Sequence, residues 1–236
     1  MAEPNHMPIA KPARAPKTAS TPKIFSLVPA EAQREMYKTI SAMKPAIFSD
    51  ASGAEIAEVA IAVAMGEQAP LILCHTARGA RAVRMTSIAA NVKNADGRLE
   101  AATVSAVAAL LGDEKATALV CAGRLQAGDD YRRVFTFAAR HKLPILYVVA
   151  NSITPGRRDA LDLRTLYAEC GIPVFSLEAN DAIAAYRVAT EALHNARHGR
   201  GPCVIEALTV GDERISKTSS LELLKGYMER HGNWPL

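Results

Sequence analysis

The sequence predicts an α/β fold with a mostly parallel sheet and helices on both faces. Residues 116–122 and 145–149 are short apolar runs, rich in small and β-branched side chains. Between them, Val134, Phe135, Phe137 and Ala138 recur at helical spacing. Two apolar strands joined by an amphipathic helix are typical of a parallel βαβ unit. With 236 residues, of which 49% are hydrophobic, the chain is long enough for one such domain.

The rest of the chain continues the alternation of helical and extended patterns on both sides of this unit. We expect a single domain over residues 30–236. Its elements are helices at 30–43, 52–66, 161–169, 181–199 and 219–232, a helix around 134–138 and an alanine-rich helix from about residue 101, and strands at 70–74, 116–122, 145–149, 172–177 and 204–208. Residues 88–98 are expected to be only a short polar link.

The ends of the two strands in the βαβ unit mark the expected site. Ligands of parallel sheets bind beyond the carboxyl ends of the strands. Here those ends are residues 122–125 and 151–154. Whatever the chain binds is therefore expected at this edge of the sheet.

The first 29 residues are expected to be a disordered tail. They hold six of the thirteen prolines, alternating with Ala and Lys, and such a segment buries too little apolar area to offset the entropy of ordering. Residues 1–24 carry +3 of the net charge of +4, so the domain itself is near neutral. A near-neutral domain argues against nucleic-acid binding. No apolar run approaches the length needed to cross a bilayer, so no membrane association is expected.

The four cysteines are widely scattered and show no paired spacing. This pattern predicts neither a zinc site nor a disulfide framework, and it suits a reducing cytoplasm. One of them, at a strand end, is a candidate nucleophile, but no histidine is near it in sequence to activate it. The cysteines are Cys74, Cys121, Cys170 and Cys203, with Cys121 the one at the strand end.

The βαβ unit resembles a known cofactor motif. Lys142-Leu143-Pro144 leads into a strand that ends at Asn151-Ser152, while the preceding strand ends at Ala122-Gly123-Arg124. This frame is similar to the thiamine diphosphate motif in the alpha subunit of 2-oxo acid dehydrogenases, the decarboxylating component of the pyruvate, branched-chain and acetoin complexes. Two later features also match that family: Asn180-Asp181 before a helix, and Gly201-Pro202 before the last strand. The resemblance implies a shortened member of the thiamine-diphosphate-binding fold.

The resemblance implies five cofactor-binding positions. Arg78 matches the family's diphosphate-binding arginine, and Asn151 takes the first position of its Asn-Asn pair. Gly123 stands where the family has its metal-binding aspartate, with Arg124 beside it, and Ser152 replaces the second asparagine. Mg²⁺ needs oxygen ligands, and this set offers no carboxylate. Thiamine diphosphate and Mg²⁺ are thus possible by resemblance but not expected to bind, and no catalytic or metal-ligating residue is assigned.

Three further residues near the site allow two interpretations each. Asp129 and Asp130 could bring a carboxylate to the metal, although they more readily cap the following helix. His75 could act as a base or form an ordinary surface hydrogen bond. The positive charge of Arg124 opposes a cation nearby.

Three functions stay open at this point. The first is an alpha-subunit-like chain that is a non-catalytic structural or regulatory partner, assembling with itself or with a beta-type subunit. The second is an active alpha half of a 2-oxo acid dehydrogenase whose beta-type partner supplies the rest of the site. The third is a cleft in which Arg78 and Arg124 bind a small anion without a metal. Loss of the family's long loops at residues 88–98 and 209–218 favours the first.

Overall fold

The core of the protein is a six-stranded sheet in which every paired strand runs parallel, in the order β2-β1-β3-β4-β6-β5. The computed structural model describes residues 25–43, 54–66, 71–74, 76–86, 92–94, 99–111, 116–125, 130–153, 163–210 and 217–235. The strands are β1 (Leu71–Cys74), β2 (Val92–Asn94), β3 (Ala118–Gly123), β4 (Ile145–Ile153), β5 (Val174–Glu178) and β6 (Cys203–Val210). The helices are α1 (Ala30–Ala42), α2 (Glu55–Met65), α3 (Ala77–Val83), α4 (Leu99–Leu110), α5 (Tyr131–Arg140), α6 (Leu163–Cys170), α7 (Ala182–Arg197) and α8 (Lys217–Arg230).

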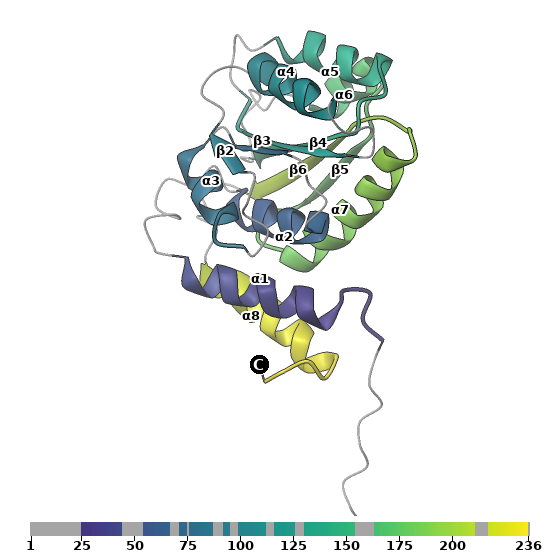
Figure 1. Cartoon of the computed structure of the whole chain (residues 1–236). Coiled ribbons are helices and arrows are strands. Elements are labelled where there is room, and N and C mark those ends of the chain that lie inside the picture. The colour runs from purple at the N-terminus through teal and green to yellow at the C-terminus, as the bar shows by residue number, and fades with distance from the viewer. Residues whose placement is uncertain are drawn as a thin grey trace, which may run out of the picture.

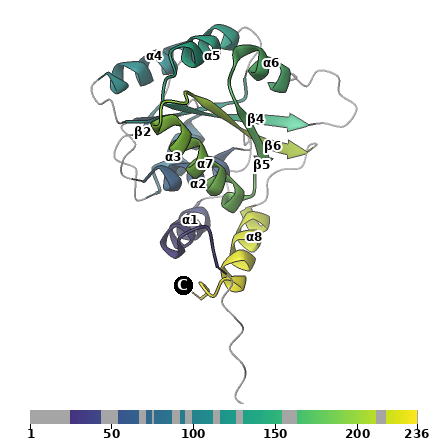
Figure 2. The same cartoon turned by 90° about the vertical axis from the view of Figure 1, so that its right-hand side faces the viewer.

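Helices cover both faces of the sheet, as the sequence predicted. Figure 1 shows α4, α5 and α6 on one face and α2, α3 and α7 on the other, with α1 and α8 forming a further layer beyond α2 and α7. Figure 2 shows the same layers from the side. When the next strand in the chain lies nearer the β5 edge of the sheet, the connecting helix lies on the α4–α6 face. When the next strand lies nearer the β2 edge, the connecting helix lies on the opposite face. This is the arrangement expected when all crossovers have the same hand.

Successive residues of a strand pack alternately into two hydrophobic cores, one on each face of the sheet. In β1, Ile72 and Cys74 pack on the α2–α3–α7 face, whereas Leu71 and Leu73 pack on the α4–α6 face. All four residues are buried. Strands buried on both faces must be apolar throughout, which is why this strand appears as an unbroken apolar run.

The direction in which the chain adds strands across the sheet changes between β1 and β3. After β1 it passes to the face that carries α3, and after β3 it passes to the face that carries α5. In open parallel sheets, such a reversal leaves a crevice beyond the carboxyl ends of the two strands. Thr76 follows β1 at this edge, and Gly123 ends β3 there.

Several elements differ from the predicted ranges, most clearly β2 and β4, and α3 had no predicted range. β2 lies within the expected polar link; it is a three-residue edge strand in which two side chains are exposed, so no apolar alternation announced it. β4 continues to Ile153, beyond its predicted end at residue 149, because it pairs with β6 up to Ile153 and Val210. Backbone pairing with a neighbouring strand extends β4 past its apolar run.

The residues just before α1, which the sequence assigned to the tail, pack against the outer helix layer. Val28 is buried, and the Ser26 hydroxyl lies 3.1 Å from the Tyr227 hydroxyl of α8. Tyr37 of α1 meets Trp234 edge to face, with 5.0 Å between ring centroids. The rest of the predicted tail, residues 1–24, lies outside the described residues. Among the described helices, none combines the length and apolar character needed to cross a membrane.

Candidate functional site

Thr76 and Arg78 form the β1 side of the strand-end crevice. Thr76 caps α3, and its Oγ1 accepts a hydrogen bond of 2.9 Å from the backbone N–H of Gly79. A threonine cap fixes where this short helix begins. Arg78, one of the five predicted site residues, is thereby held in the first turn of α3, where it is half-buried.

Gly123 forms the β3 side, and both its backbone conformation and its neighbour disfavour a side chain there. Its φ is +65°, a left-handed conformation that favours glycine. The register between β3 and β4 shifts between Cys121 and Gly123. A Cβ at Gly123 would lie 3.2 Å from the methyl carbon of Thr76, tighter than an ordinary contact. Conformation and crowding therefore both oppose an aspartate at this position.

Arg124 and Ser152 complete the predicted set. Arg124 directly follows Gly123 and is exposed. Ser152 pairs in β4 with Thr209 of β6, and its side chain lies outside the described part of the structure. The structure thus brings the predicted residues to the same edge of the sheet, at the ends of β1, β3 and β4.

A hydrogen-bonded network centred on Glu206 lies at the β4–β6–β5 part of this edge. Glu206 is only 3% exposed. Its Oε1 accepts a 2.7 Å hydrogen bond from Nδ2 of Asn151, and its Oε2 accepts a 2.6 Å bond from the hydroxyl of Ser176. The Thr209 hydroxyl also donates to the backbone carbonyl of Asn151, at 3.3 Å. Asn151 is therefore held at both its side chain and its backbone.

Tyr167 adds a buried hydroxyl on the same side of the sheet. The hydroxyl has no hydrogen-bond partner among the described residues. Burial raises the pKa of Tyr167, and the negative charge of Glu206 raises it further. The phenol therefore stays protonated at neutral pH.

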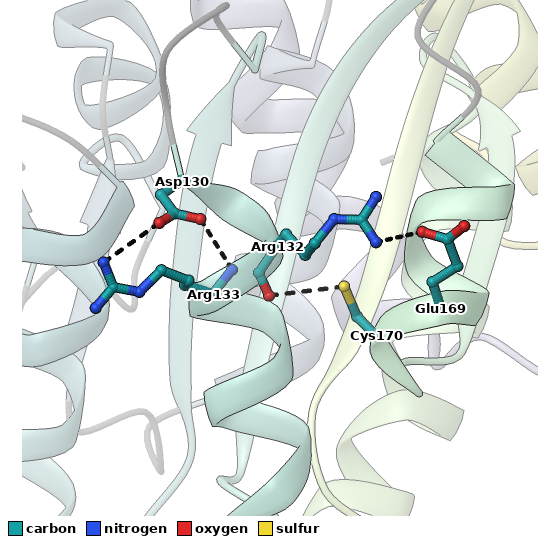
Figure 3. A network of polar contacts seen from close by, with 5 residues as sticks. All are labelled: Asp130, Arg132, Arg133, Glu169 and Cys170. Carbon is teal, nitrogen blue, oxygen red and sulfur yellow. Dashed lines mark hydrogen bonds and ion pairs between the residues drawn. The ribbon is translucent and has the colours of Figure 1, made fainter.

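The Asp130 carboxylate caps the N-terminus of α5. Its Oδ1 accepts from the backbone N–H of Arg133 at 3.2 Å, and its Oδ2 pairs with the Arg133 guanidinium at 3.4 Å. Figure 3 shows this pair beside the link between Arg132 of α5 and Glu169 of α6. The capping interpretation of Asp130 is confirmed. Asp129 and His75 lie outside the described residues.

Cys121 is unsuited to nucleophilic chemistry. It is 1% exposed, and a hydrogen bond with Cys74, together with burial, raises the pKa of its thiol well above the ordinary value. A reactive cysteine needs the opposite, a lowered pKa and access to substrate. All four cysteines are buried and free.

The described residues do not fit the Mg²⁺ and thiamine diphosphate that the resemblance implies. Mg²⁺ needs an octahedron of oxygen ligands, normally including a carboxylate. Gly123 offers no side chain, and both oxygens of Glu206 already accept hydrogen bonds. No cluster of three or more potential metal-ligating side chains occurs in the part of the chain that the structure describes.

Sequence reasoning missed the role of Glu206. The one signal that could have found it is that this glutamate is a charged residue within the apolar strand that follows Gly201-Pro202. Its partners come from β4 and β5, and the strand register that joins them is not visible in the sequence.

Comparisons with known proteins agree with the resemblance. A family model described as dehydrogenase E1 component matches residues 74–211, more than half of the chain. The pyruvate dehydrogenase E1 component subunit alpha of Acholeplasma laidlawii is 35% identical over 89 residues, which cover 35% of this chain and 26% of that protein. The subunit of the same name from Rhizobium meliloti is 35% identical over 81 residues, covering 32% of this chain and 23% of that one.

The matched stretch spans only about a quarter of the length of these curated relatives. Among solved structures, a thiamin diphosphate-dependent enzyme from Mycobacterium smegmatis is similar with a TM-score of 0.46 and 19% identity. That similarity covers 66% of this chain and 31% of the other.

Proposed function

Because this chain belongs to the dehydrogenase E1 component family, we propose that it is an alpha-subunit-like member with a degraded Mg²⁺ and thiamine diphosphate motif. It acts as a non-catalytic structural or regulatory subunit. The observation that carries this proposal is Gly123, where the family has its metal-binding aspartate. The positive φ of Gly123 and the nearby Thr76 methyl both disfavour an aspartate side chain at this position.

The charges around Gly123 support the same conclusion. Arg124 follows it directly, and Arg78 lies in the first turn of α3, the helix that follows the neighbouring strand β1. Two guanidinium groups at this edge oppose a cation and favour an anion. The nearest described carboxylate to Asn151, that of Glu206, is held in its own network.

The alternative is an active alpha half of a thiamine diphosphate-dependent 2-oxo acid dehydrogenase. In that case Arg78, Arg124 and Asn151 would hold the phosphates, and a beta-type subunit would supply the remaining groups. One observation favours it: Asn151 is fixed in place by Glu206 and Thr209, as a ligand-binding amide should be. This oxidoreductase activity would appear only in the assembled complex.

Assembly with a second copy or with a beta-type subunit is part of the proposal. The outer face of α4 supports it: Val104 is 68% exposed and Leu111, directly after the helix, is 82% exposed. Glu100 is the one charged residue of α4. An uncharged, partly apolar helix face is typical of a surface that another chain covers. A location in the reducing cytoplasm also belongs to the proposal, supported by the four free cysteines.

Calorimetric titration with thiamine diphosphate and Mg²⁺ tests the proposed function. The purified chain is titrated alone and again with a beta-type E1 subunit, and the mass of the mixture is measured by light scattering. We expect assembly without Mg²⁺-dependent cofactor binding. Tight, Mg²⁺-dependent binding in either setting would reject the non-catalytic proposal in favour of the active alpha half.

A further inference from the structure

Glu58 is a glutamate in the first turn of α2, and it is completely buried. Its side chain is 0% exposed, and neither carboxyl oxygen has a hydrogen-bond partner among the described residues. Buried carboxylates in proteins are normally hydrogen-bonded or paired with a cation. Glu58 therefore needs an explanation that the proposed function does not provide.

The first turn of α3 lies directly against this carboxyl group. A Cβ built at Gly79 would be 2.3 Å from Oε2 of Glu58, so only a glycine allows this approach. The same position lies 2.9 Å from Oγ1 of Thr76, the α3 cap. The carboxyl group is thus enclosed by the helix start that also carries Arg78.

The titratable groups that face Glu58 do not stabilise a negative charge. Cys74 of β1 and Cys121 of β3 lie opposite each other in register, and Glu55 lies one turn back on α2. α7 and α1 contribute apolar side chains to the shared core, among them Ala189 and Met36. The buried polar residues of α1, Gln33 and Thr39, carry no charge. The nearest arginine along α3, Arg78, makes other contacts.

An ionised Glu58 is unstable in this environment. Burial raises its pKa well above the ordinary glutamate value, and Cys74 and Glu55 raise it further. An unpaired buried charge must be neutralised or reach water. At low pH the carboxyl is neutral and the packing is undisturbed; at high pH the ionised form must be hydrated.

Among the elements that enclose Glu58, α3 is the one best able to move. β1 and β3 are interior strands of the sheet, and α7 packs along α2 with a row of alanines. α3, by contrast, has seven residues and leads to the three-residue edge strand β2. Short elements at the edge of a fold open locally at the lowest free-energy cost.

We propose that the contact between Glu58 and the first turn of α3 is a proton-controlled latch. α3 stays packed on α2 while the carboxyl is neutral, and it moves away to admit water when the carboxyl ionises. The inference does not depend on the proposed function. Because α3 carries Arg78 and Thr76 lies next to Gly123, opening the latch would also rearrange the β1 side of the crevice.

The direction of the pH dependence follows from the raised pKa. The stability that the neutral carboxyl contributes is fully present below the pKa of an unfolded glutamate. It is lost as the pH rises through the raised pKa of the folded state. Local opening of α3 is therefore expected to increase with pH.

Amide hydrogen exchange of residues 76–86 tests the latch. Exchange of the wild type and of Glu58→Gln is compared at each pH from about 4, just below the pKa of an unfolded glutamate, to about 9, above which few buried glutamates remain protonated. Comparison at equal pH cancels the intrinsic pH dependence of exchange. We expect a wild-type to variant rate ratio near one at the acid end, rising to about tenfold or more at the alkaline end.

Two controls keep this test decisive. Glu191→Gln, an exposed position on α7, should leave the ratio at one throughout. Within the wild type alone, exchange of residues 76–86, divided by the chemical rate, should rise with pH relative to the α7 segment 182–197. A ratio that stays flat with pH would overturn the proposal, and so would a Gln variant that opens more than the wild type at every pH.

Discussion

Two buried glutamates lie on opposite faces of the same sheet and have opposite surroundings. Glu206 is 3% exposed, and its two carboxyl oxygens accept hydrogen bonds from Asn151 and Ser176. Glu58 is 0% exposed, and no described residue donates to either of its oxygens. The two carboxyl groups are therefore buried to a similar degree, but only that of Glu206 has hydrogen-bond donors next to it.

The difference separates two ways in which a fold tolerates a buried carboxyl group. Donors compensate for lost hydration, so the Glu206 network stabilises the packing of β4, β5 and β6. Without donors, a carboxyl group is tolerated by remaining protonated, and its surroundings become sensitive to pH. The β4–β6 part of the edge is therefore expected to be rigid, and the β1–α3 part to be adjustable.

Removing Glu206 should have the largest effect on stability. Glu206→Ala leaves the Asn151 amide and the Ser176 hydroxyl without an acceptor and opens a cavity, for a cost of about 3 kcal/mol. Chemical denaturation at pH 7 measures this cost. Glu178→Ala, an exposed glutamate on β5, is the control and should change little. Equal effects in the two variants would show that the network contributes nothing.

A methyl group at Gly79 should have the next largest effect. Gly79→Ala places Cβ against the Glu58 carboxyl and should cost about 2 kcal/mol through overpacking. In a Glu58→Ala background the contact with the carboxyl group is removed and only the 2.9 Å contact with Thr76 Oγ1 remains, so part of that cost should vanish in a double-mutant cycle. Gly226→Ala in α8, where a Cβ meets nothing closer than 3.7 Å, is the control. Additive costs would argue against the α2–α3 contact.

Restoring the family's aspartate should cost stability without creating a metal site. Gly123→Asp must adopt a positive φ and crowd the Thr76 methyl, for a cost of about 1.5 kcal/mol. Thermal unfolding with and without Mg²⁺ and thiamine diphosphate measures both effects. Gly171→Asp, which has φ +71° and no neighbour within 4 Å, isolates the backbone contribution. Stabilisation of Gly123→Asp by Mg²⁺ would mean that the turn can rebuild the metal site.

The surface link between α5 and α6 should have the smallest effect. Arg132 and Glu169 form an ion pair between exposed side chains. Exposed pairs of this kind contribute little, so Arg132→Ala should leave the melting temperature unchanged within error. A clear drop in the melting temperature would mean that the Arg132–Glu169 ion pair stabilises the packing of α5 on α6.

Much of the fold was predictable because parallel strands and their helices carry strong local signals. The sequence predicted β1, β3 and β4 as apolar runs, because strands buried on both faces are apolar throughout. It also predicted α5 from apolar residues at helical spacing. Asp130 was correctly interpreted as a cap. The edge strand β2 was not found, because two of its three side chains face solvent.

The candidate site was predictable only as a location and as a set of residue types. The sequence by itself determined only which residue types stand there: Gly123 and Ser152 at the positions where the resemblance implies metal ligands, and Asn151 beside them. Arg78 and Arg124 were expected at strand ends; Arg124 directly follows β3, whereas Arg78 lies in the first turn of α3. A residue type at a given position can be seen in the sequence once the motif around it is recognised.

Only the tertiary structure decided which groups meet across that frame. Glu206 binds a residue 55 positions away on β4 and another 30 positions away on β5. Glu58 is enclosed by a helix and two strands that follow it in the chain. Both contacts depend on strand register and helix packing, which are set by the whole core, so no local pattern distinguishes the satisfied carboxyl from the unsatisfied one.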